Sequence, residues 1–290
     1  MRSMWRWVAL LPFLTATLPA ADPAGLALAE LSFSFYTQEH GIRDGFLKYL
    51  ARDGMVFRPA VTPARPVYEK AKPGGGKLAW RPQEVVVASS DDLGMSWGPF
   101  TFTVAGAPAS HGHYFSVWRR EAGAWRLYLD LGVSHPPVDI PVPDWSVPLE
   151  RPDEQPLLTD AAFALEKERL LARESSLVLD AGDPAPFLAQ LDPRVVLLRD
   201  GVAPIRGTAG YEVPKGGRTW KPLGGELSRA GDLAVCYGEA SDGASAGKVP
   251  TRRCSYVHVW RRTAGRWRLI AEATLPLPPA ERGSVGAAGK

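Results

Sequence analysis

Cysteine and histidine are scarce in this chain, and a strong excess of charge of either sign is missing. Only two cysteines and five histidines occur in 290 residues, without the clustering of a metal site. The sequence also lacks a glycine-rich phosphate loop and a nucleophile elbow. A formal net charge of +3 gives no basic footprint for nucleic acid. We therefore expect no metal, no cofactor and no nucleic-acid partner.

Long apolar runs are also missing, apart from a short one near the N-terminus. Arg2 and Arg6 supply positive charge, an apolar run covers residues 7–14, and small residues follow at 19–21. This pattern is typical of a secretory signal peptide, and the run is too short to span a bilayer. A short buried helix is the alternative interpretation. We expect residues 1–20 to be removed and the protein to be periplasmic or secreted, without a membrane span.

An internal repeat is the strongest pattern in the sequence. Residues 117–127 recur as residues 259–269, with nine of eleven positions identical. Upstream, Trp80 has a counterpart in Trp220, and the segment 92–98 has one in 232–238. Because the blocks keep their order and spacing, the chain contains two diverged copies of one unit. We place the first domain at 22–133 and the second at 159–275.

The segments outside the two copies have a different composition. Residues 134–158 contain seven prolines, which disfavour both helix and sheet and predict an extended linker. Residues 276–290 are rich in proline, glycine and alanine and are expected to form a disordered tail.

Each copy shows the same order of predicted elements. In the first, Asp22 and Pro23 are typical of a helix start, and Leu28, Leu31 and Phe35 recur at helical spacing before Gly41. A second short helix is predicted at 46–51. Strands are expected at 55–58, 78–88, 93–104, 113–120 and 125–133, and the second copy repeats this order. The fold class is α+β: helices followed by a meander of antiparallel strands.

The repeated blocks resemble nuclear transport factor 2-like proteins, in particular the SnoaL-like and ketosteroid-isomerase-like branch. The residues that carry this resemblance are 78–82, 93–98, 117–120 and 125–127. It implies two tandem cone-shaped domains, each with N-terminal helices packed on a curved antiparallel sheet around an apolar pocket. It also suggests that the two domains pair with each other within the chain, as the subunits of dimeric relatives do.

A carboxylate or imidazole in such a pocket is the chemistry that the resemblance implies. Asp130 on the last strand of the first copy is the main candidate, and Glu272 is its counterpart. Alternation puts Arg126, Tyr128 and Asp130 on one strand face, without showing which face is concave. An ordinary surface ion pair is the alternative for Asp130. His113 is a candidate partner that titrates near neutral pH.

Other candidates lie on the first helix and on the strands. Tyr36 and His40 share one helix face, with Tyr36 a tentative catalytic residue and His40 a tentative ligand-binding one. Trp97 and Tyr128 are candidates for an aromatic pocket wall. Core packing is the alternative for these aromatic residues.

The two cysteines are expected on neighbouring strands of one hairpin. In an oxidising compartment Cys236 and Cys254 could form a disulfide, and two buried free thiols are the alternative.

Two functions remain open at this point. The first is an exported protein that binds a small apolar or aromatic molecule, or another partner, through its conical pocket. The alternative is a cofactor-independent isomerase, cyclase or hydratase that uses Asp130 with His113 or Tyr36. The second requires these side chains to converge on one cavity.

Overall fold

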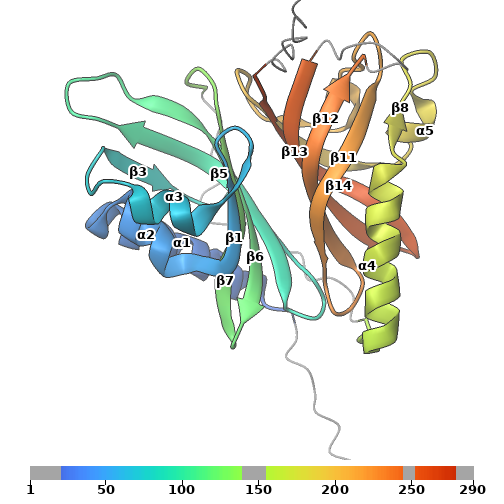
Figure 1. The fold of residues 1–290 in the computed structure, drawn as a ribbon, viewed down its shortest axis with the longest axis horizontal. Coiled ribbons are helices and arrows are strands. Elements are labelled where there is room, and N and C mark those ends of the chain that lie inside the picture. Colours follow the sequence, from blue (N-terminus) through green and yellow to red (C-terminus); the bar gives the residue numbers. More distant parts are fainter. Residues whose placement is uncertain (1–20, 139–154, 244–251, 279–290) are drawn as a thin grey trace, which may run out of the picture.

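A computed structural model of the chain describes residues 21–138, 155–243 and 252–278 (Figure 1). The predicted signal peptide (1–20), most of the predicted linker (139–154) and most of the predicted tail (279–290) lie outside the described residues. In the part that is described, no helix has both the length and the apolar character needed to cross a bilayer.

The first half consists of three helices and seven strands. The helices are α1 (Pro23–His40), α2 (Ile42–Tyr49) and α3 (Ala64–Lys70). The strands are β1 (Leu50–Phe57), β2 (Val61–Pro63), β3 (Lys77–Trp80), β4 (Glu84–Val87), β5 (Leu93–Thr103), β6 (Ser110–Glu121) and β7 (Ala124–Ser134). They form one sheet in the order β2-β1-β7-β6-β5-β3, and β4 also pairs with β5. All neighbouring strands are antiparallel except β1 and β7.

The second half repeats this plan. Its helices are α4 (Asp160–Ser175) and α5 (Ala185–Leu188), with a 3₁₀ turn at Thr208–Gly210. Its strands are β8 (Val178–Leu179), β9 (Leu191–Arg199), β10 (Ile205–Arg206), β11 (Arg218–Leu227), β12 (Leu233–Asp242), β13 (Arg252–Thr263) and β14 (Arg266–Pro276). The order β10-β9-β14-β13-β12-β11 matches the first sheet, β8 adds an edge strand beside β11, and β9 and β14 again run parallel. The fold class is therefore confirmed: two α+β units, each with helices against one curled sheet (Figure 1).

Local sequence signals explain several element boundaries. The Asp22 carboxylate accepts the backbone N–H of Gly25 at 3.0 Å and caps α1, and Gly41 with φ 88° follows its last residue. The hairpin between β6 and β7 turns at Ala122 and Gly123, both with positive φ, and Ala264 and Gly265 repeat this in the second half. Two successive residues with positive φ match the twist of the paired strands. The repeated Ala-Gly pair is therefore a repeated turn.

The buried face of α1 differs from the predicted one. The side chains that face the sheet include Leu26, Glu30 and Phe33, whereas Leu28 and Phe35 are exposed. The helix was predicted correctly, but the repeat of Leu28, Leu31 and Phe35 does not mark the face that packs against the sheet. Apolar residues occur on both faces of the helix, and the face toward the sheet also carries the buried carboxylate of Glu30.

A β-bulge changes the predicted alternation on β7. Trp118 pairs with Leu127 and Val117 pairs with Leu129, so Tyr128 is an extra residue on this strand. As a result Leu127 faces the helices while Tyr128 faces away from them, and the prediction that Tyr128 shares a face with Asp130 is wrong. The second half has the same bulge at Ile270.

The helix-free faces of the two sheets contact each other in one apolar cluster. It contains Trp97, Phe115, Val117 and Leu129 from the first half and Val196, Val235, Val257 and Val259 from the second. At its edge the turns exchange hydrogen bonds: Ser89 N–H donates to Asp232 at 2.8 Å, and Arg229 N–H donates to Asp92 at 2.9 Å. Asp92 and Asp232 are equivalent residues of the repeat. Such reciprocal contacts are what a twofold relation between two units produces.

Candidate functional site

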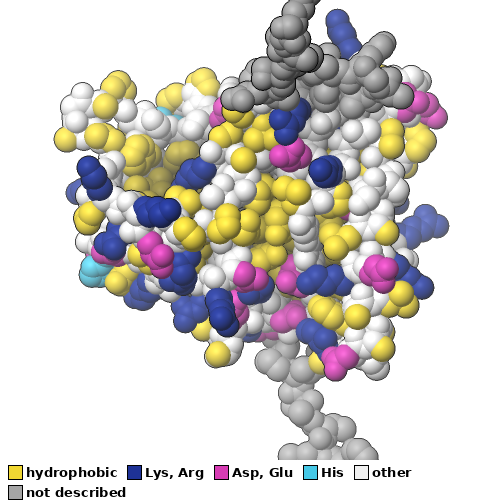
Figure 2. Space-filling model, in the orientation of Figure 1, with side chains coloured by type: hydrophobic (Ala, Val, Ile, Leu, Met, Phe, Trp, Pro, Cys, Tyr) yellow, Lys and Arg dark blue, Asp and Glu magenta, His cyan; other side chains and the backbone are white. Residues whose placement is uncertain are grey.

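A cavity of about 390 Å³ lies between the helices and the sheet of the first half. It is lined by α2, the end of β1, β3, β5, β6 and β7. The wall is mainly aromatic and aliphatic, with Ile42, Phe46, Leu78, Trp80, Phe100, Phe102, Tyr114 and Leu131. Polar groups come from Arg58, Ser110, Asp130 and Ser134. On the face drawn in Figure 2 the first half carries a hollow with hydrophobic walls.

Asp130 is the acidic group of this cavity. It lies on the helix side of β7 opposite Ser116, whose hydroxyl donates to Asp130 Oδ1 at 3.0 Å. Burial raises the pKa of Asp130 to about 6, although the charge of Arg58 and the hydrogen bond from Ser116 oppose the rise. The carboxyl therefore titrates near neutral pH next to apolar walls.

Tyr114 and Arg58 are the other polar groups near Asp130. The Tyr114 hydroxyl is buried and makes no well-formed hydrogen bond, although Ser96 is close enough to affect its pKa. Arg58 donates to the Tyr68 hydroxyl at 2.7 Å and also lines the cavity. The cavity thus offers a carboxyl and a guanidinium to a bound molecule, with Tyr114 as part of its wall.

A second buried carboxyl, Glu30 on α1, lies beside the cavity. It accepts the indole N–H groups of Trp80 at 2.6 Å and Trp118 at 2.8 Å, and the hydroxyl of Ser96. Burial raises its pKa to about 7 despite these three donors. Trp80 both lines the cavity and holds Glu30, so the two features share a side chain. Sequence reasoning missed Glu30, although its equivalent in the second half, Glu174, repeats the pattern.

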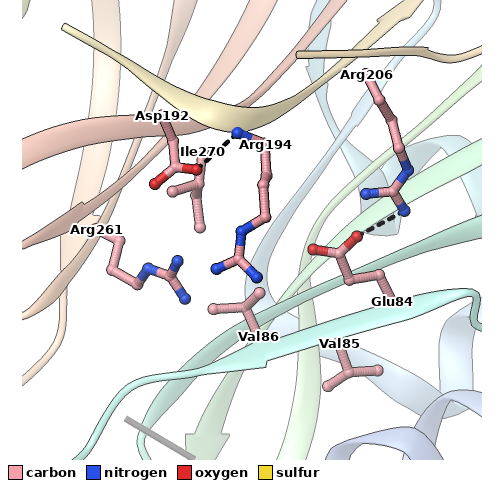
Figure 3. Close-up of a pocket in the computed structure, with 8 residues that line it drawn as sticks. All are labelled: Glu84, Val85, Val86, Asp192, Arg194, Arg206, Arg261 and Ile270. Atoms are coloured by element: carbon pink, nitrogen blue, oxygen red, sulfur yellow. Dashed lines mark hydrogen bonds and ion pairs between the residues drawn. The ribbon is translucent and has the colours of Figure 1, made fainter. Parts of the chain in front are cut away.

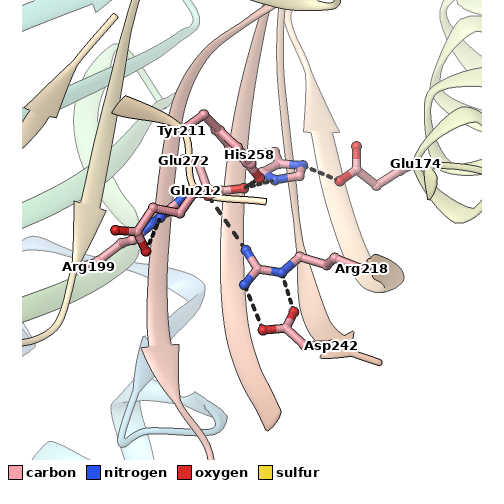
Figure 4. A network of polar contacts seen from close by, with 8 residues as sticks. All are labelled: Glu174, Arg199, Tyr211, Glu212, Arg218, Asp242, His258 and Glu272. Carbon is pink, nitrogen blue, oxygen red and sulfur yellow. Dashed lines mark hydrogen bonds and ion pairs between the residues drawn. The ribbon is translucent and has the colours of Figure 1, made fainter. Parts of the chain in front are cut away.

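In the second half the equivalent positions are joined by a histidine. Glu174 on α4 accepts the indole N–H of Trp260 at 2.9 Å, as Glu30 does with Trp118. His258 stands where Ser116 stands in the first half, and Glu272 stands where Asp130 does. His258 Nδ1 lies 2.6 Å from Glu174 Oε1, and Nε2 lies 3.0 Å from Glu272 Oε2. The imidazole therefore bridges helix and sheet (Figure 4).

The network continues from Glu272 to the rim of the second half (Figure 4). The Tyr211 hydroxyl donates to Glu272 Oε2 at 3.0 Å, and Arg199 lies 3.3 Å from Oε1. Arg218 makes two hydrogen bonds to Asp242, at 2.6 and 3.0 Å. Glu272 is thus surrounded by three cationic groups, His258, Arg199 and Arg218, and by the phenol of Tyr211.

Electrostatics fix the charges of the central pair. Burial alone would lower the pKa of His258, but the charges of Glu174 and Glu272 raise it to about 9. Burial alone would raise the pKa of Glu272, but His258 and the two arginines lower it to about 2. At neutral pH the pair is an imidazolium and a carboxylate, both fully buried.

The structure separates the other predicted strand residues from Asp130. His113 projects from the opposite face of β6, where Nδ1 lies 2.8 Å from Nε2 of His135. Burial, with a contribution from His135, lowers its pKa to about 4. Trp97 and Tyr128 lie in the apolar cluster between the two sheets. The expected convergence of His113 with Asp130 is therefore absent. Side chains alternate between the two faces of a sheet along each strand, and those of His113 and Asp130 point to opposite faces.

The two helix residues also lie away from the cavity wall. The rings of Tyr36 and His40 are 4.0 Å apart, and Lys48 Nζ lies 3.5 Å from the centre of the Tyr36 ring. Neither residue lines the cavity described above, and His40 is about half exposed, with 49% of its side chain accessible.

The predicted disulfide is corrected by the structure. Cys236 and Cys254 lie on neighbouring strands, as expected, and both are buried free thiols. In the β12–β13 register Cys236 faces His258 and Cys254 faces Ala240, so the two cysteines are not opposite each other. Among the described residues, no group of three or more His, Cys, Asp and Glu side chains is arranged to hold a metal ion.

No family model matches the sequence, and no curated protein matches it either. Similar solved structures include an NTF-2-like protein of unknown function from Shewanella oneidensis, with 13% identity, 38% of this chain and 96% of the other covered, and a TM-score of 0.32. A protein of unknown function with a cystatin-like fold from Nostoc punctiforme is 18% identical. The match covers 42% of this chain and 96% of the other, with a TM-score of 0.31. A putative scytalone dehydratase from Novosphingobium aromaticivorans is 12% identical. The match covers 38% of this chain and 82% of the other, with a TM-score of 0.32. These likenesses concern the fold alone, and they assign neither a family nor a reaction to this chain.

Proposed function

We propose that the first domain binds a small molecule with an aromatic or alicyclic body and a hydrogen-bond donor that contacts Asp130. The observation that carries this proposal is the cavity of about 390 Å³ with aromatic walls and one carboxyl. Its volume lies within the range of small-molecule sites, roughly 300–1,000 Å³. Rings such as Phe100 and Phe102 favour a flat apolar ligand, and a donor group on that ligand would satisfy Asp130.

The proposal predicts a pH-dependent affinity for a phenol. A phenolic hydroxyl donates more strongly to an ionised carboxylate than to a neutral carboxyl. We expect 2-naphthol to bind more tightly as the pH rises through about 6, the pKa of Asp130, and naphthalene, which lacks the hydroxyl, to bind equally at both ends of that range. Isothermal titration calorimetry at pH 5 and pH 8 measures both.

Two variants locate the effect. Asp130→Asn should abolish the pH dependence and weaken 2-naphthol binding at pH 8 by about tenfold, since hydrogen bonds to charged groups contribute roughly 1.5–3 kcal/mol. Asp44→Asn is the matched control, because Asp44 is an exposed carboxylate on α2. Equal affinity of 2-naphthol for the wild type and Asp130→Asn would contradict the proposal.

Acid–base catalysis at the same cavity is a second candidate. The observation that favours it is a carboxyl with a pKa of about 6 beside Tyr114 and Arg58. The activity to test is exchange of the protons next to the carbonyl of a cyclic ketone with D₂O, followed by NMR. Exchange by the wild type and not by Asp130→Asn would support catalysis, whereas equal rates would exclude it for that substrate class.

Pairing of the two domains and export complete the proposed function. The reciprocal contacts of Asp92 and Asp232 support a pairing in which the second domain serves as the structural partner of the first. Export follows from the pattern of residues 1–20 alone, and mass spectrometry of the N-terminus of the expressed protein tests it. An intact Met1 in the periplasmic or secreted fraction would exclude cleavage.

A further inference from the structure

Arg58 lies at the mouth of the Asp130 cavity. It directly follows β1 and is one of the exposed residues of the cavity lining, together with Ser110 and Ser134. Val56 pairs with Asp130 between β1 and β7, and Arg58 is two residues further along the chain. Arg58 is close enough for its charge to oppose the rise that burial causes in the pKa of Asp130. The cavity therefore has a cation at its mouth and an acid further in.

Two stacked aromatic rings hold the Arg58 side chain in place. Arg58 Nη2 donates to the Tyr68 hydroxyl at 2.7 Å, and the Tyr68 ring stacks on the ring of Phe46 with 4.2 Å between their centres. Tyr68 and Phe46 are both buried, and Phe46 is itself part of the cavity wall. A group that is held in position before a ligand arrives loses little conformational entropy when the ligand binds. The guanidinium is therefore preorganised beside an aromatic wall.

The hydrogen-bond partners of Arg58 are neutral groups. Besides the Tyr68 hydroxyl, the backbone carbonyl of Phe57 accepts from Nη1 at 3.3 Å, and no carboxylate in the described part of the chain forms an ion pair with Arg58. In the cavity of about 290 Å³ between the two halves, by contrast, Arg206 pairs with Glu84 at 2.9 Å (Figure 3). A guanidinium has five N–H donors, so the two hydrogen bonds of Arg58 leave three for a ligand.

A carboxylate is the anion that fits this arrangement. The planar guanidinium group matches a carboxylate in a bidentate geometry. The aromatic wall, which includes Phe100 and Phe102, favours a ligand in which that carboxylate is attached to a flat ring. The distance between the mouth and the acid matters as well, because a rigid ring keeps the carboxylate of the ligand away from the carboxylate of Asp130 and so weakens their repulsion.

We propose that the ligand of this cavity is a hydroxyaryl carboxylate, with its hydroxyl group at Asp130 and its carboxylate paired with Arg58 at the mouth. This inference rests on the proposed function, since it takes the Asp130 cavity as the ligand site, and it adds the chemical class of the ligand. Arg58 is then a residue that determines specificity, because it separates carboxylates from neutral phenols.

Calorimetric titration of the full chain at pH 8 and low salt tests this proposal with three probes. They are 6-hydroxy-2-naphthoate, its neutral amide 6-hydroxy-2-naphthamide, and 2-naphthol. We expect the carboxylate to bind at least tenfold more tightly than either neutral probe, and this advantage to shrink as the salt concentration rises. Equal affinities of the carboxylate and the amide would overturn the proposal.

Two variants locate the carboxylate. In Arg58→Gln the ratio of the affinities for 6-hydroxy-2-naphthoate and 2-naphthol should fall to about one or below, since the charged contact is lost. Arg52→Gln is the matched control, because Arg52 is an exposed arginine of β1 that does not line the cavity, and it should keep the ratio of the wild type. A ratio that persists in Arg58→Gln would overturn the assignment of Arg58.

The same titrations separate this inference from the proposed function. If 2-naphthol binds to the wild type but the carboxylate has no advantage over it, the cavity is a ligand site and only the carboxylate class is wrong. If none of the three probes binds, the proposed function fails and this inference fails with it. Circular dichroism and a thermal unfolding scan of each variant show whether it is folded.

Discussion

His258 and Glu272 face each other across β13 and β14, with Nε2 of the imidazole 3.0 Å from Oε2 of the carboxylate. In the first half the same two positions hold Ser116 and Asp130, whose oxygens are also 3.0 Å apart. The contact is thus retained in both copies while its chemistry differs. Ser116 is short and leaves Asp130 at an open cavity, whereas His258 extends from Glu272 to Glu174 on the helix. Of the two units of the repeat, one thus encloses a cavity and the other is held by a buried ion network.

The first prediction concerns the stability that His258 provides. His258→Ser introduces the residue of the first half and leaves Glu174 and Glu272 buried without their shared cation. Removing one member of a buried ion pair typically costs about 3–5 kcal/mol. Urea unfolding should show a loss of about 3 kcal/mol or more. Ser116→Ala is the control, with an expected loss of about 1 kcal/mol from one hydrogen bond. Equal losses in the two variants would contradict the role assigned to His258.

The second prediction concerns the pH dependence of stability. The folded pKa of His258, about 9, lies above its ordinary value of 6.5, so its contribution is complete below pH 6.5 and is lost as the pH rises through about 9. The folded pKa of Glu272, about 2, lies below its ordinary value of 4.5, so its contribution is complete above pH 4.5 and is lost as the pH falls through about 2. His258→Gln should therefore abolish the alkaline part of the profile and also weaken the acid part, because the charge of His258 helps to lower the pKa of Glu272.

The buried carboxyls of the first half affect stability in the opposite sense to Glu272. The folded pKa values of Asp130 and Glu30, about 6 and about 7, lie above their ordinary values, so their contribution is complete at low pH and is lost as the pH rises through 6 to 7. Unfolding free energies measured from pH 4.5 to pH 10 should decline up to about pH 7 because of these carboxyls, continue to decline between pH 6.5 and about 9 because of His258, and level off above that. A flat profile over this range would contradict the assigned charges.

The third prediction concerns the two cysteines. Because Cys236 and Cys254 are not opposite each other in the β12–β13 register, both should remain thiols. Burial raises the pKa of the Cys254 thiol to about 11, which further lowers its reactivity in the folded chain. Thiol titration of the denatured, unreduced protein should find two free thiols. A count of zero would show that the disulfide expected from the sequence forms after all.

The sequence predicts the architecture well because the repeat preserves its turns and its large aromatic residues. Trp118 and Trp260 occupy equivalent positions, and each donates to a helix glutamate. Asp130 could be singled out as an acid on the last strand, but alternation alone does not tell the helix side from the other side. The bulge at Tyr128 also interrupts that alternation, and a bulge of this kind has no clear pattern in one sequence.

The rest of the candidate site depends on tertiary packing. Glu30 lies between apolar residues on α1 and is recognisable only once Trp80 and Trp118 are seen to donate to it. His113 and Trp97 have the chemistry of a pocket wall, yet they pack between the two sheets, because the helix-free faces of both sheets are buried. A sequence pattern with buried residues on both faces does not reveal which face encloses a ligand.

The most direct test of the account is whether filling the first cavity abolishes binding. Gly132 lines this cavity, and a Cβ added there would lie in ordinary contact with the Phe100 ring at 3.4 Å, so the methyl groups of Gly132→Val take up space in the cavity. Its equivalent in the second half is Thr274, and Thr274→Val is the control. Calorimetric titration with 2-naphthol should show binding by the wild type and Thr274→Val and none by a folded Gly132→Val. Unchanged binding by folded Gly132→Val would contradict the assignment of the first cavity as the ligand site.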